Sequence, residues 1–112
     1  MTSRRARRKD KKHNDRLRER AWESFLRGDL EGAGGLYKEA VSRAPGNARY
    51  LFELGLVERA RGRDELAERA WRRVLAATPH HDGALGELAL LLGRTGRLEE
   101  ALELADQASS NR

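Results

Sequence analysis

The chain has no cysteine, only two prolines, and two residues each of tryptophan, tyrosine and phenylalanine among its 112 residues. Without cysteine, disulfide bonds and thiolate-based metal or nucleophile chemistry are excluded, which fits a reducing compartment. No stretch approaches the ~20 apolar residues that a membrane-spanning helix requires, and the N-terminus lacks the apolar stretch of a secretory signal. We therefore expect a soluble, cytoplasmic protein of one domain or one short repeat array.

Positive charge is concentrated at the N-terminus. Residues 1–20 contain ten Lys or Arg against three Asp or Glu, a formal charge of +7, whereas residues 21–112 carry −2. Residues 1–13 contain too little apolar surface to form a core, so we interpret them as a basic flexible arm or as an N-terminal extension of the first helix. The basic residues of this arm are Arg4, Arg5, Arg7, Arg8, Lys9, Lys11 and Lys12.

The rest of the chain repeats with a period of 34 residues. A shift by this period aligns leucine with leucine and glycine with glycine, in the sets Leu17, Leu51, Leu85 and Gly28, Gly62, Gly96. The same shift places Pro45 on Pro79. The period divides the chain into units 14–47, 48–81 and 82–112.

Each unit is predicted to contain two helices. Apolar residues recur every three to four positions on both sides of the central glycine, which is the period of an amphipathic helix. The glycine ends the first helix because it enters the left-handed backbone region without a Cβ penalty. Asp29 and Asp64 stand where they can cap the second helix, and Pro45 and Pro79 end it. The fold class is therefore all-α, with about six helices.

Residue size suggests how these helices pack. Tyr37 and Trp71 are expected to fill the space toward the neighbouring unit. Small residues allow the two helices of a unit to approach closely. These are Ala21, Gly55 and Ala89, facing Ala33, Ala67 and Ala101.

Together these features resemble the tetratricopeptide repeat, a 34-residue helical hairpin that stacks into a superhelix with a concave groove. The resemblance covers residues 14–112 and implies an α-solenoid of three stacked hairpins. It is strongest in the middle unit, at Leu51, Leu54, Gly55, Gly62, Ala67, Trp71 and Pro79. Arg20 departs from the pattern, since leucine is usual there, and suggests a rotated first helix.

No residues in the sequence are arranged for catalysis. His80, His81 and Asp82 are metal-ligand residue types, but they lie in the turn after Pro79, where adjacent side chains diverge. We interpret this turn as solvated. We predict no enzyme activity, no catalytic residue, no metal site and no cofactor.

The resemblance implies that the first helix of each unit lines the groove. The residues at these positions are apolar or basic: Arg18, Trp22, Phe25, Arg49, Phe52, Leu56, Arg59, Leu90 and Arg94. Such a surface suits a peptide or amphipathic helix with acidic flanks, and Phe52 and Leu56 are the expected central anchors. Trp22 fits the groove and packing between units equally well.

Two further features bear on the ligand. Gly83, Gly86 and Gly93 suggest that it approaches the backbone of the third unit closely. Family members that hold a chaperone's C-terminal carboxylate use basic or amide residues where this chain has Glu53 and Glu87, so that mode is not expected.

The predicted function is a non-catalytic protein-protein interaction module, an adaptor or scaffold. The alternative is a nucleic-acid-associated or self-assembling protein that uses the basic arm, whose phosphate contacts would be weak and salt-sensitive. Nucleic acid is the less favoured partner, because no aromatic residue interleaves the arm, and a solubilising tail is the simplest interpretation of it. Leu98, Leu102 and Ala105 have no following hairpin to cover them, so we also expect self-association through the third unit, or a partner that docks there.

Overall fold

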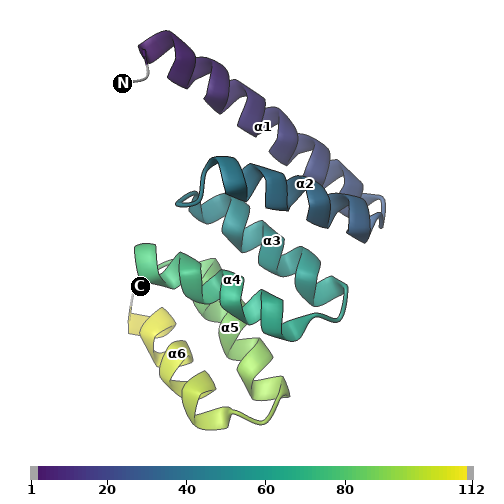
Figure 1. Cartoon of the computed structure of the whole chain (residues 1–112). Coiled ribbons are helices and arrows are strands. Elements are labelled where there is room, and N and C mark those ends of the chain that lie inside the picture. The colour runs from purple at the N-terminus through teal and green to yellow at the C-terminus, as the bar shows by residue number, and fades with distance from the viewer. Residues whose placement is uncertain (1–2, 111–112) are drawn as a thin grey trace.

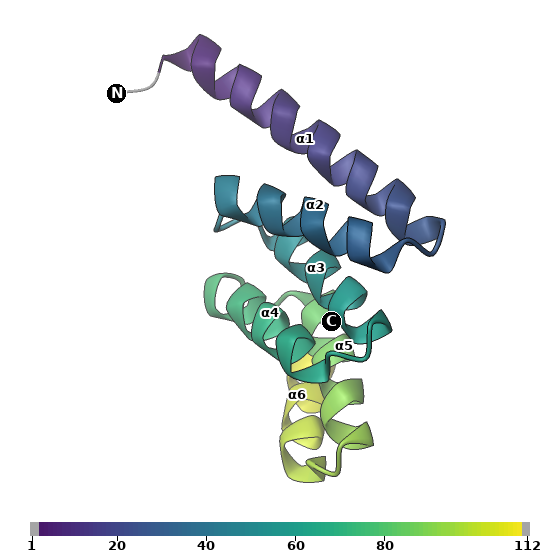
Figure 2. The same ribbon diagram turned by 45° about the vertical axis from the view of Figure 1, so that its right-hand side comes forward.

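The computed structural model describes residues 3–110 and shows six α-helices that stack in chain order (Figure 1). They are α1 (Arg4–Leu26), α2 (Leu30–Arg43), α3 (Ala48–Ala60), α4 (Asp64–Ala77), α5 (Asp82–Arg94) and α6 (Leu98–Ser110). Consecutive helices form three hairpins, and the hairpins contact one another through α2 with α3 and through α4 with α5. The stack is elongated, 47 × 31 × 20 Å, and a second view shows each hairpin turned relative to the last (Figure 2). The prediction of an all-α solenoid of three hairpins is confirmed.

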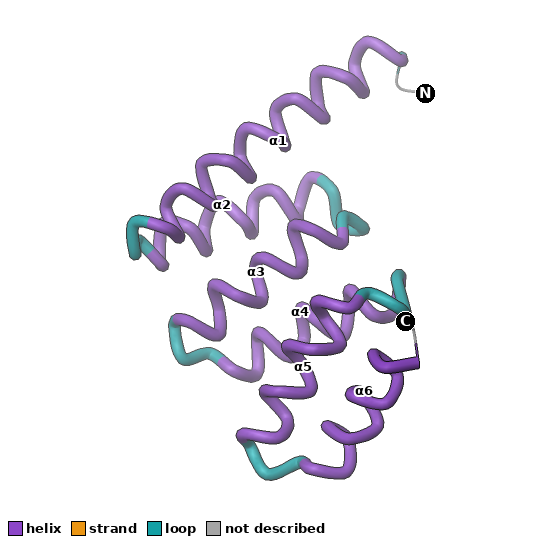
Figure 3. Tube along the Cα trace, turned by 180° about the vertical axis from the view of Figure 1, so that it is seen from behind, coloured by secondary structure: helices purple, strands orange, loops and turns teal. Residues whose placement is uncertain are grey.

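A glycine ends the first helix of each hairpin, as predicted. Gly28, Gly62 and Gly96 have φ angles of 83°, 79° and 86°, which lie in the left-handed region. The residue after each glycine donates its N–H to a carbonyl five positions earlier, as Arg63 does to Glu58 at 2.8 Å. This is the hydrogen bond of a Schellman motif, and it fixes the short reversals seen in Figure 3.

The second helices begin with two different arrangements. Asp29 caps α2, as predicted, by accepting a hydrogen bond from the Gly32 N–H at 2.9 Å. Asp64 does not cap α4, because Arg63 holds the cap position and its side chain makes no capping hydrogen bond. Asp64 instead accepts a hydrogen bond from Arg94 at 3.2 Å. The capping prediction for Asp64 is therefore wrong, although its charge does lie at the positive end of the helix dipole.

Small residues and two aromatic side chains form the core. Ala21, Ala33 and Ala67 have no exposed surface, and neither do Tyr37 and Trp71. The prediction that these aromatics are packing residues is confirmed. The small residues let the two helices of a hairpin approach closely, and the aromatic rings are buried in the same core.

The basic N-terminal segment is helical. Helix α1 begins at Arg4, and the Ser3 side chain accepts a hydrogen bond from the Ala6 N–H at 3.1 Å. Residues 4–13 therefore extend the first helix, and the flexible-arm interpretation does not describe them. Residues 1–2 of the predicted arm lie outside the described residues. The extension projects past the end of α2 (Figures 1 and 2) and all seven of its basic side chains are exposed.

The exposure of Arg20 does not come from a rotated helix. Helix α1 buries Leu17, Ala21 and Ser24, the same repeat positions that α3 buries, so no rotation is observed. Arg20 is exposed, whereas Leu88 at the same position in α5 is fully buried. The difference arises because α5 packs on a preceding helix and α1 does not.

Helix α6 is the least buried of the six helices. It buries only Ala101, and the predicted uncovered residues Leu98, Leu102 and Ala105 are all exposed. Even with these leucines, no helix within residues 3–110 is long and apolar enough to cross a membrane.

Candidate partner-binding surface

The first helices of the hairpins, α1, α3 and α5, are joined along one face by two ion pairs. Arg18 of α1 binds Glu53 of α3, and Arg59 of α3 binds Glu87 of α5. All nine predicted groove residues lie on these three helices. The side of α1, α3 and α5 that carries these two ion pairs is here called the inner face, and the ion pairs link it from the first hairpin to the third.

Arg18 holds the first two hairpins together. Its guanidinium donates two hydrogen bonds to the Glu53 carboxylate, both at 2.7 Å, and the Tyr37 hydroxyl donates a third at 2.9 Å. The hydrogen bonds to Glu53 raise the pKa of Arg18, while burial and the nearby Glu53 carboxylate raise the pKa of Tyr37. Because this bidentate pair is mostly buried, Arg18 contributes to the fold, and little of its guanidinium is available to a partner.

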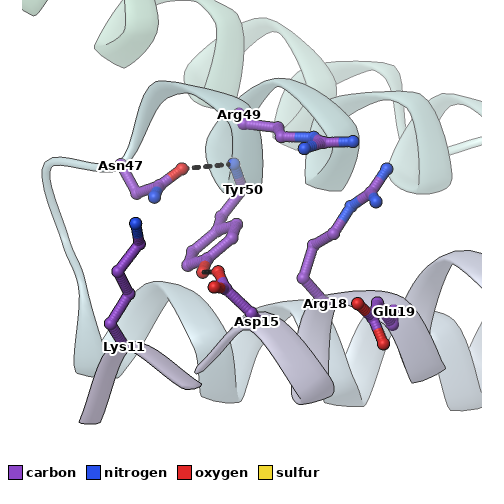
Figure 4. Close-up of a pocket in the computed structure, with 7 residues that line it drawn as sticks. All are labelled: Lys11, Asp15, Arg18, Glu19, Asn47, Arg49 and Tyr50. Carbon is purple, nitrogen blue, oxygen red and sulfur yellow. Dashed lines mark hydrogen bonds between the residues drawn. The ribbon is translucent and has the colours of Figure 1, made fainter. Parts of the chain in front are cut away.

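A polar hollow of about 400 Å³ lies where α1 meets the start of α3 (Figure 4). The Tyr50 hydroxyl donates to Asp15 at 3.1 Å, and the Tyr50 N–H donates to the Asn47 side chain at 3.0 Å. Figure 4 shows the guanidinium groups of Arg18 and Arg49 on the same side of the hollow. The remaining lining residues are Lys11 and Glu19.

Sequence reasoning missed most of this hollow. Asn47 carries a detectable signal, since it follows Pro45 and immediately precedes a helix, as a capping residue does. Asp15 and Tyr50 are 35 residues apart, and nothing in the local pattern indicates their contact.

Arg59 is also partly committed to the fold. Its guanidinium pairs with Glu87 and lies over the Trp71 ring, 5.6 Å from the ring centroid. Arg49 is more open, because its side chain is exposed and lies 3.5 Å from Glu53 in a weaker second contact. The predicted acid-binding arginines of the inner face therefore differ in availability.

Trp22 and Phe25 form an aromatic pair at the first-hairpin end of the inner face. Their ring centroids are 5.5 Å apart, and the Arg18 guanidinium lies 5.4 Å from the Trp22 ring. Both rings are half-buried against a small core cluster that includes Tyr37 and Val57. Each ring thus supports packing and leaves part of its surface exposed.

Phe52 is packed partly against its own chain. Its ring lies 5.2 Å from the His81 ring, and a Cβ on Gly83 would come within 3.0 Å of Phe52 Cζ. The close approach that we expected from a ligand at Gly83 is therefore made by Phe52. Phe52 and Leu56 are both half-buried, so each leaves some apolar surface on the inner face.

A second hollow, of about 340 Å³, lies at the third-hairpin end of the inner face. Its lining residues are Arg59, Leu90, Leu91 and Arg94. Leu90 is 70% exposed, and the Arg94 side chain is 58% exposed and pairs with Asp64 at 3.2 Å. A hollow lined by an exposed leucine and two arginines suits an apolar side chain that neighbours a carboxylate.

The histidine turn has a structural role. His81 Nδ1 accepts a hydrogen bond from the Ala84 N–H at 3.0 Å and so caps α5. In residues 3–110, no three His, Cys, Asp or Glu side chains are grouped closely enough to hold a metal ion.

Comparison with known proteins places these hairpins in context. A family model described as tetratricopeptide repeat matches residues 19–71 and 52–111. Cellulose synthase operon protein C of Xanthomonas axonopodis pv. citri (strain 306) is 38% identical over 81 residues. That alignment covers 72% of this chain and 5% of the relative, so the chain corresponds to a small part of that protein.

Solved structures share the fold at low sequence identity. The crystal structure of MamA has a TM-score of 0.85 and 18% identity, over 88% of this chain and 57% of that one. The Yersinia enterocolitica type III secretion chaperone SycD, in complex with a peptide of the translocator YopD, has a TM-score of 0.82 and 20% identity, over 87% and 74%. The first TPR of Spaghetti (RPAP3), bound to the HSP90 peptide SRMEEVD, has a TM-score of 0.83 and 16% identity, over 88% and 79%.

Proposed function

Because this chain belongs to the tetratricopeptide repeat family, we propose that it is a non-catalytic protein-interaction module whose inner face binds a segment of another protein. The observation that carries the proposal is the hollow at Leu90, which this exposed leucine lines together with Arg59 and Arg94. The core is closed without this leucine, since Leu88 and Leu92 of the same helix are fully buried. An exposed apolar side chain in a hollow is a feature of binding surfaces.

The chemistry of the inner face favours an acidic partner. Half-buried Phe52 and Leu56 supply apolar contact at its centre, and exposed Arg49 of α3 and Arg94 of α5 supply positive charge. Arg18 and Arg59 already bind carboxylates of this chain, so we assign the recognition of acidic residues chiefly to Arg49 and Arg94. An amphipathic helix or extended segment with acidic flanks fits this arrangement.

Two similar structures support a peptide as the ligand class. The SycD structure contains a YopD peptide, and the RPAP3 structure contains an HSP90 peptide. We do not propose capture of a C-terminal carboxylate for this chain, because Glu53 and Glu87 already occupy the guanidinium groups of Arg18 and Arg59 that would bind it.

The proposal is tested by affinity capture with the full chain as bait and quantitative mass spectrometry of the bound proteins. Leu90→Asp and Arg94→Glu should both lose the same protein. Arg43→Glu, a charge reversal on α2, is the matched control and should retain it. A partner retained equally by all four baits would show that the inner face is not its binding site.

A nucleic-acid role is the second candidate, and the exposure of all seven basic side chains of the α1 extension favours it. Phosphate contacts from a helix of this charge would weaken steeply with salt. Replacing Arg4, Arg5, Arg7 and Arg8 with glutamine should leave protein capture intact. If the bait instead recovers only nucleic acid, and loses it with these four changes, the interaction-module proposal is wrong and the nucleic-acid role is correct.

A further inference from the structure

The first two hairpins share a large aromatic side chain that the third lacks. Tyr37 of α2 and Trp71 of α4 are fully buried and occupy the same position in the 34-residue repeat. Tyr37 donates to Glu53, and the Trp71 indole donates to the Phe52 carbonyl at 3.1 Å. The same position in α6 is Ala105, so the third hairpin has no large side chain to fill the space that Tyr37 and Trp71 fill in the first two.

The missing side chain leaves a groove of about 440 Å³ between α5 and α6, here called the C-terminal groove. All of its lining residues are apolar or small, including Ala105 and Ala108. Leu90, Leu98 and Leu102 also line it and are 70%, 63% and 64% exposed. Exposed leucines thus stand beside an unfilled apolar space.

The corresponding surfaces of the other hairpins are covered. Helix α3 packs on α2 and α5 packs on α4, while no described segment packs on the outer side of α6. A contiguous apolar surface that is covered in two repeats and open in the third is a candidate interface.

We propose that the C-terminal groove binds the same groove of a second copy of this chain, in a two-fold symmetric dimer. A two-fold interface requires a surface that is complementary to itself. The C-terminal groove meets this requirement in shape, because it combines three protruding leucines with a space lined by small residues. A leucine of one copy enters the space at Ala105 of the other, where Tyr37 and Trp71 stand in the first two hairpins.

The charges around the groove are also self-complementary. On the α5 side, exposed Arg94 lies beside Leu90. On the α6 side, the helix carries exposed Glu99, Glu103 and Asp106 and no basic residue, while its fourth acid, Glu100, is already paired with Arg72 and Arg97. A two-fold axis parallel to the helices places the basic α5 edge of each copy over the acidic α6 edge of the other, which pairs opposite charges at the rim.

Analytical ultracentrifugation of the purified full chain over a wide concentration range tests this proposal. The expected result is a reversible monomer-dimer equilibrium without larger species. Leu102→Glu should weaken dimerisation at least about 30-fold, as removal of a central interface anchor does. Leu26→Glu is the matched control, because Leu26 is 68% exposed but lies on α1, outside the groove, and it should leave the equilibrium unchanged.

A second variant, Ala105→Trp, tests the role of the unfilled space without introducing a charge into the groove. Ala105→Trp restores the side chain that α4 carries, so it should fill the groove, weaken dimerisation at least about 10-fold and leave the melting temperature equal or higher. A monomer at every concentration, larger oligomers, or a dimer that both variants leave intact would each overturn the proposal. Leu90 lines both this groove and the hollow of the inner face, whereas Leu102 and Ala105 line only the groove. Leu102→Glu should therefore lose the dimer and keep the inner-face partner, so failure of the dimer proposal leaves the inner-face proposal standing.

Discussion

Trp71 occupies the space that a side chain at position 55 would need. A Cβ built on Gly55 would lie 2.6 Å from Cε2 of the indole, which is far inside normal contact distance. Gly55 stands within α3, where glycine costs roughly 1 kcal/mol relative to alanine. The chain accepts this cost because the glycine lets the largest buried side chain lie directly against the helix backbone.

Gly55→Ala should therefore lower the free energy of unfolding by about 1–3 kcal/mol, since overpacking outweighs the gain in helix propensity. Urea denaturation measures the change. The matched control is Gly35→Ala in α2, where nothing lies within 4 Å of the new Cβ and the residue is exposed. That control should stabilise the chain by about 0.5–1 kcal/mol. If Gly55→Ala stabilises the chain as Gly35→Ala does, the indole of Trp71 moves aside at little cost.

Glu53→Gln should destabilise the stack between the first two hairpins. The amide leaves the largely buried Arg18 guanidinium without its carboxylate, and we expect a loss of about 2–3 kcal/mol, less than for a fully buried pair because Arg18 retains some contact with water. Tyr37→Phe removes one hydroxyl from the same network and should cost about 1 kcal/mol. In a double-mutant cycle, Arg18→Met should recover part of the loss caused by Glu53→Gln. Strict additivity of the two changes would contradict the coupling.

Stability should fall in acid because of an ion-pair network between α4 and α6. Burial of Glu68 opposes its ionisation, but hydrogen bonds from Arg72 and Arg97 outweigh burial and lower its pKa below 4.5. A carboxylate whose pKa is lower in the folded state stabilises the fold above its unfolded pKa, and this contribution is lost as pH falls through the folded pKa. The melting temperature should therefore drop below about pH 4.5.

Glu68→Gln should lower the melting temperature at neutral pH and make it less dependent on pH in the acid range. The control is Glu31→Gln, an exposed acid near the start of α2, outside this network. If the melting temperature of both variants depends on pH as that of the wild type does, Glu68 makes no net contribution to the loss of stability in acid.

Local and periodic features made most of the fold predictable. Gly62 and Pro79 act through their own backbone restrictions, and the 34-residue period repeats them, so the hairpins follow from short-range chemistry. The helical extension was predicted only as one of two alternatives, because the composition of residues 1–13 argues against burial. Arginine, lysine and alanine are nonetheless good helix formers, and the extension continues a helix that Leu17 and Ala21 already anchor.

The helices that carry the candidate site were predictable, but the pairing of their side chains was not. The period places Arg18 and Arg59 on first helices, yet their partners Glu53 and Glu87 are 35 and 28 residues away. Such pairs depend on the rotation and spacing of stacked helices, which the hydrophobic period does not specify. For the same reason, the sequence did not show that Phe52 packs against Gly83, and this glycine was interpreted as a ligand contact.

Leu90→Ala should weaken binding of the inner-face partner about 10-fold or more while leaving the fold nearly unchanged. The side chain is 70% exposed, so its truncation removes little burial within the chain but removes an anchor from the interface. The loss should appear mainly as faster dissociation in surface plasmon resonance. Trp71→Ala is the contrasting variant, since it should lower the melting temperature first. Unchanged affinity of folded Leu90→Ala would remove this leucine from the site.

Arg94→Glu should slow association with an acidic partner and reduce the salt dependence of that rate. Arg94 is 58% exposed and its pair with Asp64 lies at the surface, so its reversal should change stability by no more than about 1 kcal/mol. A charge at the rim of an interface acts mainly by steering the encounter, and this effect is screened by salt. Arg43→Glu is the matched control, because Arg43 is also exposed and pairs at the surface with Glu39, but it lies on α2, away from the inner face. In stopped-flow measurements, the association rate constants of the two variants should therefore differ at low salt and become similar at high salt. If both charge reversals slow association equally, the partner responds to the net charge of the chain, and Arg94 is not part of the binding site.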